Sequence, residues 1–296
     1  MARDGSPDGE DAARDRIAAL IDCVTPARPT RVVEVGANPI NDNPYARLRD
    51  MGGCEVWGFE PDPRAFGRLK AGPRETYLPH AVGDGTTRTL HVTRMPSLTS
   101  LLRPRPRTTA YLERAARPMT VEREVAVETV ALDALAEPDA FELLKIDVQG
   151  GEAIVFDGAA GHLSRVAAVV TEVAFVPLYE GQPLMDEQMR RLRSHGLMMH
   201  KFLHLKGLSL RGGLNTGLHK RRHRNQLIDG DAAFIRDLTD PEDVPDETLK
   251  HLAILADAVL ESFDLAVRCL DLLIARGAID TGAARGYVAR LPDLAR

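Results

Sequence analysis

Two short apolar runs, each ending close to a glutamate, most constrain the fold of this 296-residue chain. The first covers residues 31–35, and the second covers residues 54–59, which Glu60 follows. Continuous apolar runs of this length are typical of strands that a parallel sheet buries on both faces. Residues 43–52 between them have the length of a helix that stops at a glycine. The pattern therefore predicts a strand–helix–strand unit.

The alternation continues on both sides of an irregular middle segment. A second helix is predicted over 62–72, where Asp62 can cap the first turn and Pro63 takes the first position, and a third strand over 76–83. Further strands are predicted at 87–93, 120–132, 141–147, 166–175, 197–205 and 231–238, and further helices at 10–24, 150–163 and 185–196. The last two strands would pair antiparallel. We therefore predict an α/β fold built on a doubly wound, mostly parallel sheet.

The two ends of the chain differ in composition from the middle. Residues 1–9 are polar and acid-rich and are expected to be disordered, and residues 10–240 would form the α/β domain. Between 249 and 274, apolar residues recur every three or four positions, which predicts one long helix or two in series before a short helix near 281–291. Residues 241–296 would thus form a C-terminal helical appendage. Its apolar stripe would either pack on the α/β domain or form a homodimer contact.

Composition and charge exclude several classes of protein. The net charge of -5 and the sequence pI of about 6.0 give no reason to expect nucleic-acid binding. Three widely separated cysteines form no disulfide framework, which favours a reduced, cytoplasmic protein. The N-terminus lacks the apolar core of a signal peptide, and the longest apolar stretch, 166–178, is too short to cross a membrane. We therefore expect neither a secreted nor a transmembrane protein.

Positive charge is concentrated in one segment. Residues 188–228 contain ten Lys or Arg and no Asp or Glu, and the string HKRRHR fills 219–224. Such a block either forms a solvated loop or forms a rim that attracts an anionic acceptor, for example a phosphorylated or nucleotide-linked sugar. The sequence leaves both interpretations open.

Four acidic side chains end predicted strands of the same sheet. They are Glu34, Glu60, Asp147 and Glu172. In open α/β sheets, ligands bind beyond the carboxyl ends of the strands, so these carboxylates are expected to lie together. Gly36 would let the backbone turn sharply after the first strand. An acid that ends the second strand suits hydrogen bonds to ribose hydroxyls, which points to an adenosine-type cofactor.

The loop after the first strand discriminates between cofactors. A dinucleotide or nucleoside triphosphate site needs several glycines, as in G-x-G-x-x-G or the Walker A loop, but the string GANPIN (36–41) has one. A nicotinamide oxidoreductase is therefore disfavoured, and the single glycine fits S-adenosylmethionine. A tight turn that binds no cofactor remains the alternative.

Several strings along the chain resemble one known family. They are VVEVGAN, GFEPDP, LPHAVGDG, SLTSLL, LLKIDVQGGE, VVTEVAFVPLYEGQP and NQLIDGDAAFIRD, in this order across residues 31–238. They resemble the FkbM family of S-adenosylmethionine-dependent methyltransferases. The resemblance implies the class I Rossmann-like methyltransferase fold, with a mostly parallel seven-stranded sheet and helices on both faces. It also implies an oxygen as methyl acceptor, since carbohydrate and natural-product hydroxyls are common acceptors in this family.

The resemblance further implies cofactor contacts at three strand ends. Those in the first loop would be Glu34, Gly36, Ala37 and Asn38, those to the ribose would be Glu60 and Pro61, and those at the adenine end would be His80, Ala81 and Val82. The first loop departs from the family's usual GANIG, because Pro39 and Asn41 change it.

Three residues are candidates for the transfer step itself. Asp147 would lie beside the methyl group as a base, a contact to the cofactor amine or a metal ligand. Glu172 lies inside an apolar strand, where burial would raise its pKa and suit it as a base, and a structural hydrogen bond is the equal alternative. Lys145 shares a strand face with Asp147. Glu152 is expected to cap the following helix.

No metal site is expected. Mg²⁺ is the one ion that the sequence leaves open, because Asp147, Glu152 and Glu172 could together supply the hard oxygen ligands that it needs. The pair His200/His204 lies in a predicted strand and the pair His219/His223 lies among cations, so neither predicts a zinc site. No GxSxG string supports hydrolysis.

Together, the residues and the resemblance predict an S-adenosylmethionine-dependent O-methyltransferase. Its acceptor would be a small molecule or glycoconjugate, with a sugar hydroxyl as the methylated group and with an anionic substituent as one option. N-methylation stays open. A non-catalytic module that keeps the fold for cofactor binding or assembly is the alternative of a different class.

Overall fold

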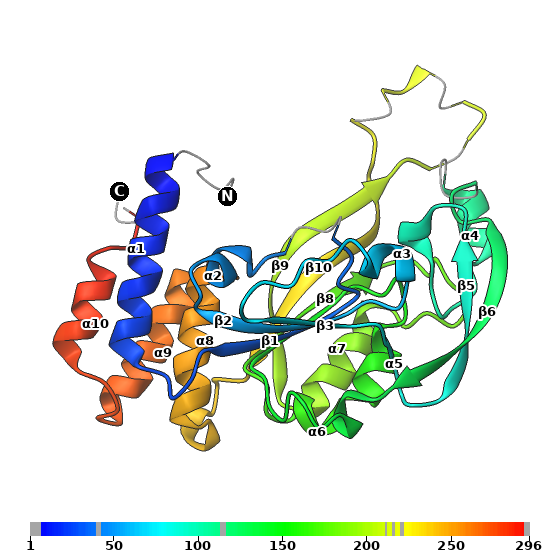
Figure 1. The fold of residues 1–296 in the computed structure, drawn as a ribbon. Coiled ribbons are helices and arrows are strands. Elements are labelled where there is room, and N and C mark those ends of the chain that lie inside the picture. Colours follow the sequence, from blue (N-terminus) through cyan, green and yellow to red (C-terminus); the bar gives the residue numbers. More distant parts are fainter. Residues whose placement is uncertain are drawn as a thin grey trace.

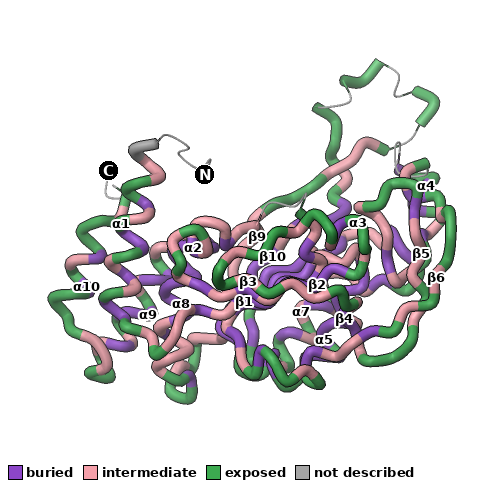
Figure 2. Tube along the Cα trace, in the orientation of Figure 1, coloured by how far each residue is buried: buried purple, intermediate pink, exposed green. Residues whose placement is uncertain are grey.

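The computed structural model describes residues 7–39, 43–112, 117–210, 212–214, 217–219 and 222–292. Figure 1 shows a central sheet with a helical bundle at one end and a second, smaller sheet at the other. Buried residues concentrate in the bundle and the central sheet, whereas a hairpin that projects from the body is exposed (Figure 2).

The central sheet has seven strands in the order β3–β2–β1–β7–β8–β10–β9. Their bounds are β1 Thr30–Val35, β2 Cys54–Phe59, β3 Glu75–Leu78, β7 Leu143–Ile146, β8 Ala168–Ala174, β9 Leu197–Leu208 and β10 Gln226–Arg236. Strands β3 to β8 in this order pair parallel, and β10 runs antiparallel to both β8 and β9. The predicted fold, a mostly parallel seven-stranded sheet of the class I methyltransferase type, is confirmed. The strand order reverses between β1 and β7, where such sheets bind ligands.

Helices cover both faces of this sheet. Because successive strand residues point to opposite sides, neighbouring residues of one strand pack against different helices. Val32 packs with α2 (Ala46–Asp50) and the terminal helices, whereas Val33 packs with α5 (Glu152–Asp157), α6 (Ala160–Leu163) and α7 (Met185–Ser194). The strands are therefore buried on both sides, which explains their continuous apolar runs. Helix α3 (Pro63–Phe66) begins at the predicted cap, where Asp62 accepts a hydrogen bond from the Arg64 N–H at 2.9 Å.

The middle segment forms a separate three-stranded sheet in the order β4–β6–β5. Its strands are β4 Ala81–Val82, β5 Thr87–Thr93 and β6 Val121–Val130, and α4 (Pro106–Tyr111) lies in the excursion between β5 and β6. Short 3₁₀ turns occupy Pro96–Leu98, Leu132–Ala134 and Pro241–Asp243. The two strands predicted here exist, but they pair with each other rather than with the central sheet. The small sheet lies beside the carboxyl ends of the central strands (Figure 1).

The two ends of the chain pack together in the bundle. Helix α1 (Pro7–Val24) lies against α8 (Asp246–Ala258) and α10 (Thr281–Val288), and α9 (Phe263–Ala275) packs on both of the latter (Figure 1). Arg16 of α1 donates two hydrogen bonds to the buried Asp257 of α8, at 2.8 and 2.9 Å. The Tyr287 hydroxyl donates a third at 2.8 Å. The two ends of the chain therefore pack in one bundle, and the predicted boundary at residue 241 stays a prediction.

The helices at the two ends of the chain differ in part from those expected. Helix α1 begins at Pro7, so residues 7–9 are helical rather than disordered, and residues 1–6 lie outside the described part. The stripe between 249 and 274 forms two helices, and its apolar face is buried in the core that includes α1 and one face of the sheet. A homodimer through these helices stays a prediction. Within the described ranges, no helix is both long and apolar enough to cross a membrane.

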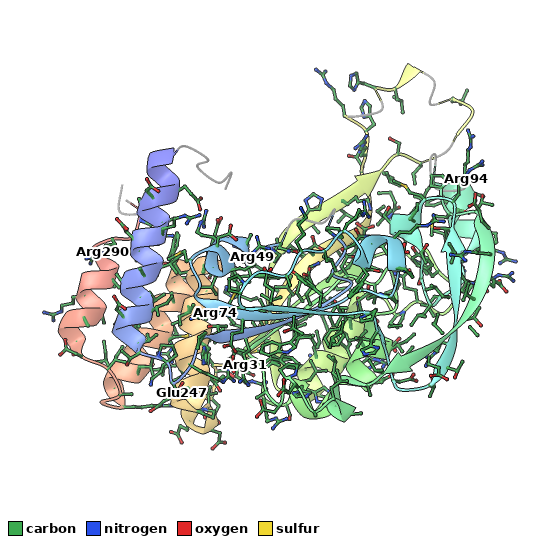
Figure 3. All side chains as sticks on the ribbon, viewed as in Figure 1. Arg31, Arg49, Arg74, Arg94, Glu247 and Arg290 are labelled. Atoms are coloured by element: carbon green, nitrogen blue, oxygen red, sulfur yellow. The ribbon has the colours of Figure 1, made fainter. Side chains whose placement is uncertain are left out.

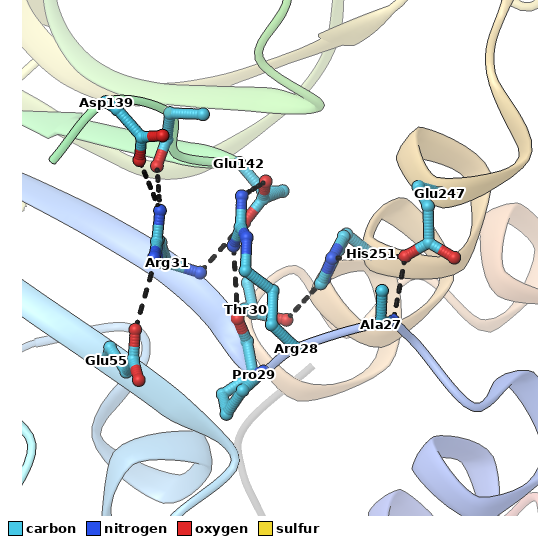
Figure 4. Close-up of polar contacts among 11 residues, drawn as sticks. Ala27, Arg28, Pro29, Thr30, Arg31, Glu55, Asp139, Glu142, Glu247 and His251 are labelled. Carbon is cyan, nitrogen blue, oxygen red and sulfur yellow. Dashed lines mark hydrogen bonds and ion pairs between the residues drawn. The ribbon is translucent and has the colours of Figure 1, made fainter.

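A polar network joins the amino ends of β1 and β7 to each other and to α8 (Figure 4). The Arg28 guanidinium donates to both carboxylate oxygens of Glu142, at 2.8 and 2.6 Å. The backbone N–H of Arg31 donates to the same carboxylate at 2.9 Å. Thr30 and His251 are hydrogen-bonded at 3.0 Å. Because paired guanidinium–carboxylate contacts fix orientation as well as distance, this network holds the strands in register with the bundle.

Candidate active site

A cavity of about 850 Å³ opens at the carboxyl ends of the central strands. Residues at the ends of β1, β2, β7, β8 and β10 line one side, and one face of the small sheet lines the other. Small-molecule sites occupy about 300–1,000 Å³, so this cavity is near the upper end of that range. It has room for a cofactor and a second small molecule.

The turn after β1 requires glycine. Gly36 has a φ of +84°, in the left-handed region, and a Cβ there would lie 2.1 Å from the backbone oxygen of Asp147. The N–H groups of Gly36 and Ala37 both donate to the Phe59 carbonyl at 3.0 Å. These contacts close the loop over the ends of β1, β2 and β7 and bring its backbone to the cavity.

The acid that follows β2 faces the cavity. Glu60 comes directly after Phe59, is 6% exposed and accepts a hydrogen bond from the Asp62 N–H at 2.8 Å. Burial raises the pKa of Glu60 above its usual value, while the Asp62 N–H opposes that shift. Pro61 lines the cavity beside it. The cavity wall thus holds one carboxylate in a fixed orientation.

Nine of the twelve predicted site residues line the cavity. They are Gly36, Asn38, Glu60, Pro61, His80, Ala81, Val82, Asp147 and Glu172. The other three, Glu34, Ala37 and Lys145, are absent from its described lining. Of the two residues expected to change the first loop, Pro39 is exposed and Asn41 lies outside the described residues.

Glu34 and Lys145 lie together behind the cavity wall. They are register partners on β1 and β7, and Lys145 Nζ forms an ion pair with Glu34 Oε1 at 2.9 Å. The Tyr45 hydroxyl donates to the other Glu34 oxygen at 2.5 Å. Burial lowers the pKa of Lys145, but the charges of Glu34 and Asp147 outweigh burial and raise it. Lys145 is therefore a buried cation that balances Glu34. Neither side chain is part of the described lining of the cavity, and their predicted contacts with cofactor and acceptor stay predictions.

Carboxylates crowd the other side of the cavity. Four of them line it: Asp147 after β7, Glu172 in β8, and Asp229 and Asp231 in β10. A fifth, Glu152 at the start of α5, is buried and outside the described lining, and its charge acts on Glu172. Gln149 Nε2 donates to Asp147 Oδ1 at 2.8 Å and to Glu172 Oε2 at 3.5 Å, so this amide bridges the two acids. Glu152 accepts from the Gly150 N–H at 3.1 Å, in the loop before α5, and no side chain caps that helix, so its predicted capping role is wrong.

Burial and mutual repulsion hold protons on this cluster. Burial raises the pKa of Glu172 well above its usual value, and the charges of Glu152 and Asp229 raise it further. Burial likewise raises the pKa of Glu152 to about 7. Burial also raises the pKa of Asp229, against the opposing charge of Lys206, whose Nζ lies 3.1 Å from Asp229 Oδ2. The raised pKa predicted for Glu172 is confirmed.

Sequence reasoning missed the β9–β10 side of the site. The cavity residues on these strands include His204, Lys206, Asp229 and Asp231. The two aspartates are two positions apart on one strand, so both point to the same face. That spacing was visible in the string IDGD. The wall formed by the small sheet gave no such signal, because its position depends on tertiary packing.

The basic segment 188–228 does not form a single rim. Three of its arginines lie on α7, where Arg191 pairs with Asp157 at 2.7 Å and with Glu187 at 3.0 Å. Lys206 lies at the cavity, and the described residues of 219–224 lie in the exposed hairpin between β9 and β10 (Figures 1 and 2). The segment thus contributes positive charge to three separate places.

The described residues include no arrangement of side chains suited to bind a metal ion. No group of three or more His, Cys, Asp or Glu side chains there is placed to hold a metal ion. The His200/His204 pair is divided, because His200 is hydrogen-bonded to the Ser262 hydroxyl at 2.7 Å whereas His204 lines the cavity.

Several methyltransferases of known structure show a low level of similarity to this chain. Precorrin-6y C5,15-methyltransferase from Geobacter metallireducens is 10% identical with a TM-score of 0.33, covering 80% of this chain and 92% of its own. Human methyltransferase-like protein 13, solved with SAH, is 11% identical with a TM-score of 0.35, covering 88% and 89%. The StiE O-MT is 10% identical with a TM-score of 0.37, covering 88% and 84%. Similarity at this level carries no argument about activity.

Sequence comparison is more specific. No curated protein matches the chain. The family described as "Methyltransferase FkbM domain" matches residues 34–197, from the glutamate of β1 to the start of β9. Because that match spans more than half of the chain, the protein belongs to the FkbM family of methyltransferases.

Proposed function

We propose that this protein uses S-adenosylmethionine to methylate a hydroxyl of a sugar or glycoconjugate. The observation that carries the proposal is one cavity that is lined both by Gly36 and Glu60 and by Asp147 and Glu172. We assign a first part of it, at Gly36 and Glu60, to the cofactor. We assign a second part, at Asp147 and Glu172, to an acceptor hydroxyl and the proton it loses.

The residues of the first part fit the cofactor. Glu60, oriented by the Asp62 N–H, can accept hydrogen bonds from the two ribose hydroxyls. The bare backbone at Gly36 leaves the loop open to the amino acid moiety. Adenine would lie along the segment His80 to Val82, which lines the cavity beside β3. When bound, the cofactor supplies an electrophilic methyl group.

Glu172 is the proposed general base. An acceptor hydroxyl would donate a hydrogen bond to its carboxylate and pass its proton there as the oxygen is methylated. Asp147 would orient the same hydroxyl, since Gln149 fixes both carboxylates from one amide. The carboxylate form of Glu172 is the form that accepts the proton. Because burial and neighbouring charges raise the pKa of Glu172, this form becomes populated at a higher pH than it would for an exposed glutamate.

The second part of the cavity suits a sugar that carries further groups. Leu90, Val92 and Val125 of the small sheet form an apolar wall on which the carbon face of a sugar ring or an attached aglycone can pack. Arg123 and Lys206 line the same cavity and would attract a negative substituent. These contacts support a glycoconjugate over a free neutral sugar.

Cofactor binding is tested first, by calorimetric titration with S-adenosylmethionine and S-adenosylhomocysteine. We expect micromolar binding by the wild type and a loss of at least about tenfold in Glu60→Ala, since a hydrogen bond to a charged group contributes about 1.5–3 kcal/mol. Glu242→Ala, which removes an exposed carboxylate, is the matched control and should bind normally. Absence of binding to the wild type would refute the proposal.

Acceptor identity is tested by transfer of labelled methyl from the cofactor to a panel of neutral, phosphorylated and nucleotide-linked sugars. The proposal expects an O-methyl product, and its position is read by mass spectrometry and NMR. A methylated amine would replace the oxygen assignment. Tight cofactor binding with no transfer to any acceptor would favour the non-catalytic module instead.

A further inference from the structure

Residues 209–225, here called the arm, join β9 to β10, and those of them that the structure describes project from the body of the molecule (Figures 1 and 2). From residue 212 to residue 225, every described residue is exposed. Leu214 is 99% exposed and Leu218 is 51% exposed. Both leucines are therefore presented to the surroundings rather than to the protein's own core.

Exposed apolar side chains gather around the arm. Besides Leu214 and Leu218, the large apolar side chains in or beside the arm are Tyr111, Leu205, Leu210 and Leu227, each between 39% and 47% exposed. Leu210 forms a bridge with Leu112 at the end of α4, and the Tyr111 hydroxyl donates to Gln226 at 3.3 Å, so α4 lies beside the base of the arm. Elsewhere in the described ranges, only Met95, Met198 and Val288 are exposed to a similar degree. Apolar exposure concentrated in one region marks a contact surface.

The arm is also strongly basic on a protein that is acidic overall. It contains five Lys or Arg and no Asp or Glu, whereas the whole chain has a net charge of -5. Arg222 and Arg224 are exposed, as is Arg107 on the neighbouring α4. Their charges are available to an anionic partner, and leucines among them add an apolar contact.

We propose that the arm docks this protein on an anionic lipid surface. Leucines at the tip would enter the boundary between headgroups and acyl chains, and the basic residues would be attracted to lipid phosphates. A second copy of the chain fits less well, because two such arms would repel each other. Single-stranded nucleic acid also fits less well, since its bases stack on aromatic rings and residues 209–225 include no Phe, Tyr or Trp.

Docking would bring the cavity to the surface as well. Strand β9 runs directly into the arm, and its residues His204, Lys206 and Leu208 line the cavity. A docked arm would therefore hold the β9 side of the cavity close to the lipid headgroups. The proposal concerns binding to lipid and does not depend on which acceptor is methylated.

The first test is sedimentation of the full chain with vesicles of phosphatidylcholine alone and of phosphatidylcholine mixed with phosphatidylglycerol. We expect the protein to pellet with the mixed vesicles and to stay in solution with the neutral ones. Binding should weaken as salt is raised, because surface charges are screened. Failure to pellet with mixed vesicles at any salt concentration would overturn the proposal.

Two pairs of variants separate the apolar from the charged contribution. Leu214→Ser with Leu218→Ser should weaken vesicle binding by roughly tenfold or more, because each leucine loses its buried area. Arg222→Ala with Arg224→Ala should weaken it by roughly fivefold for each cation removed. The matched control is Val288→Ser at the end of α10 with Arg290→Ala two residues beyond it. It should bind normally, since Arg290 lies at the opposite end of the molecule from the small sheet and the arm (Figure 3).

The remaining outcomes also discriminate. A wild-type dimer that the leucine variant converts to a monomer, measured by light scattering, would assign the arm to a second copy and overturn lipid docking. Vesicle binding that the arm variants leave unchanged would do the same. Cofactor affinity of the arm variants, measured by calorimetry, should equal that of the wild type. If the wild type binds vesicles but not the cofactor, the proposed function fails while lipid docking stands.

Discussion

The two ends of the central sheet use charge in opposite ways. At the amino ends of β1 and β7, Glu142 accepts hydrogen bonds from the Arg28 guanidinium and from the Arg31 N–H. At the carboxyl ends, Asp147 and Glu172 share the amide of Gln149, and burial together with neighbouring carboxylates raises the pKa of Glu172. The first end pairs opposite charges, whereas the second crowds like charges.

The difference indicates which end is structural and which is reactive. Paired charges hold geometry, and separating them costs stability. Crowded carboxyls destabilise the fold unless protons neutralise them, so their presence in a cavity points to chemistry rather than to stability. Buried Lys145 pairs with Glu34, and the more exposed Lys206 pairs with only one member of the cluster, Asp229. The cluster therefore depends on protons for much of its neutralisation.

The largest expected effect tests the crowded end. Glu172→Gln should lower kcat/KM by about 10²–10⁴, the usual contribution of a general base. Its thermal stability should stay the same or rise, because one repelling carboxyl is removed. Unchanged cofactor affinity, measured by calorimetry, is the control. Activity within a few-fold of wild type would show that the crowded carboxyls do not take the proton.

The next effect tests the paired end. Glu142→Ala should lower the free energy of unfolding by about 2–3 kcal/mol, because it leaves the Arg28 guanidinium and the Arg31 N–H without their acceptor. Urea denaturation measures the change. Glu55→Ala removes a more exposed partner of Arg31, at 3.2 Å, and should cost no more than about 1 kcal/mol. Equal losses in the two variants would contradict the anchoring role of Glu142.

The last test is a dependence of stability on pH to which the crowded end should contribute. Folded Glu152 keeps its proton up to about pH 7, whereas the unfolded chain loses it near the usual value of 4.5. Between these values the folded state binds more protons, so the free energy of unfolding should fall as pH rises, by up to about 1.4 kcal/mol per pH unit. Denaturation across this window should give a flatter curve for Glu152→Gln. The same slope in the variant would exclude Glu152 as its source.

The fold could be predicted because its strands are buried on both faces. Strands β2 and β5 occupy the predicted residues 54–59 and 87–93. The helices that follow β1 and β2 were predicted too long, over 43–52 and 62–72. Helix α3 ends before Gly67, because glycine has a low helix propensity. The apolar residues after Gly67 do not continue the helix. Periodicity finds such elements but not where short ones stop.

The site could be predicted only in part, because one position along a strand changes where a side chain points. Glu60 and Asp147 follow the last residues of β2 and β7, so their side chains reach beyond the sheet. Glu34 and Lys145 lie inside their strands, and Tyr45 covers the face to which Glu34 points. A linear pattern locates the end of a strand, but tertiary packing decides which face is covered.

The joining of the two chain ends in one bundle has a consequence for synthesis. Arg16 and its partner Asp257 are 241 positions apart, so α1 leaves the ribosome long before α8 exists. At about 5–20 residues per second, that interval lasts roughly 12–50 s. Until it ends, Ile17 and Leu20 of α1 lack the helices that bury them in the finished protein. A chain that stalls before α8 therefore leaves α1 open to chaperones and proteases, and translation of the last helices decides whether the first one is protected.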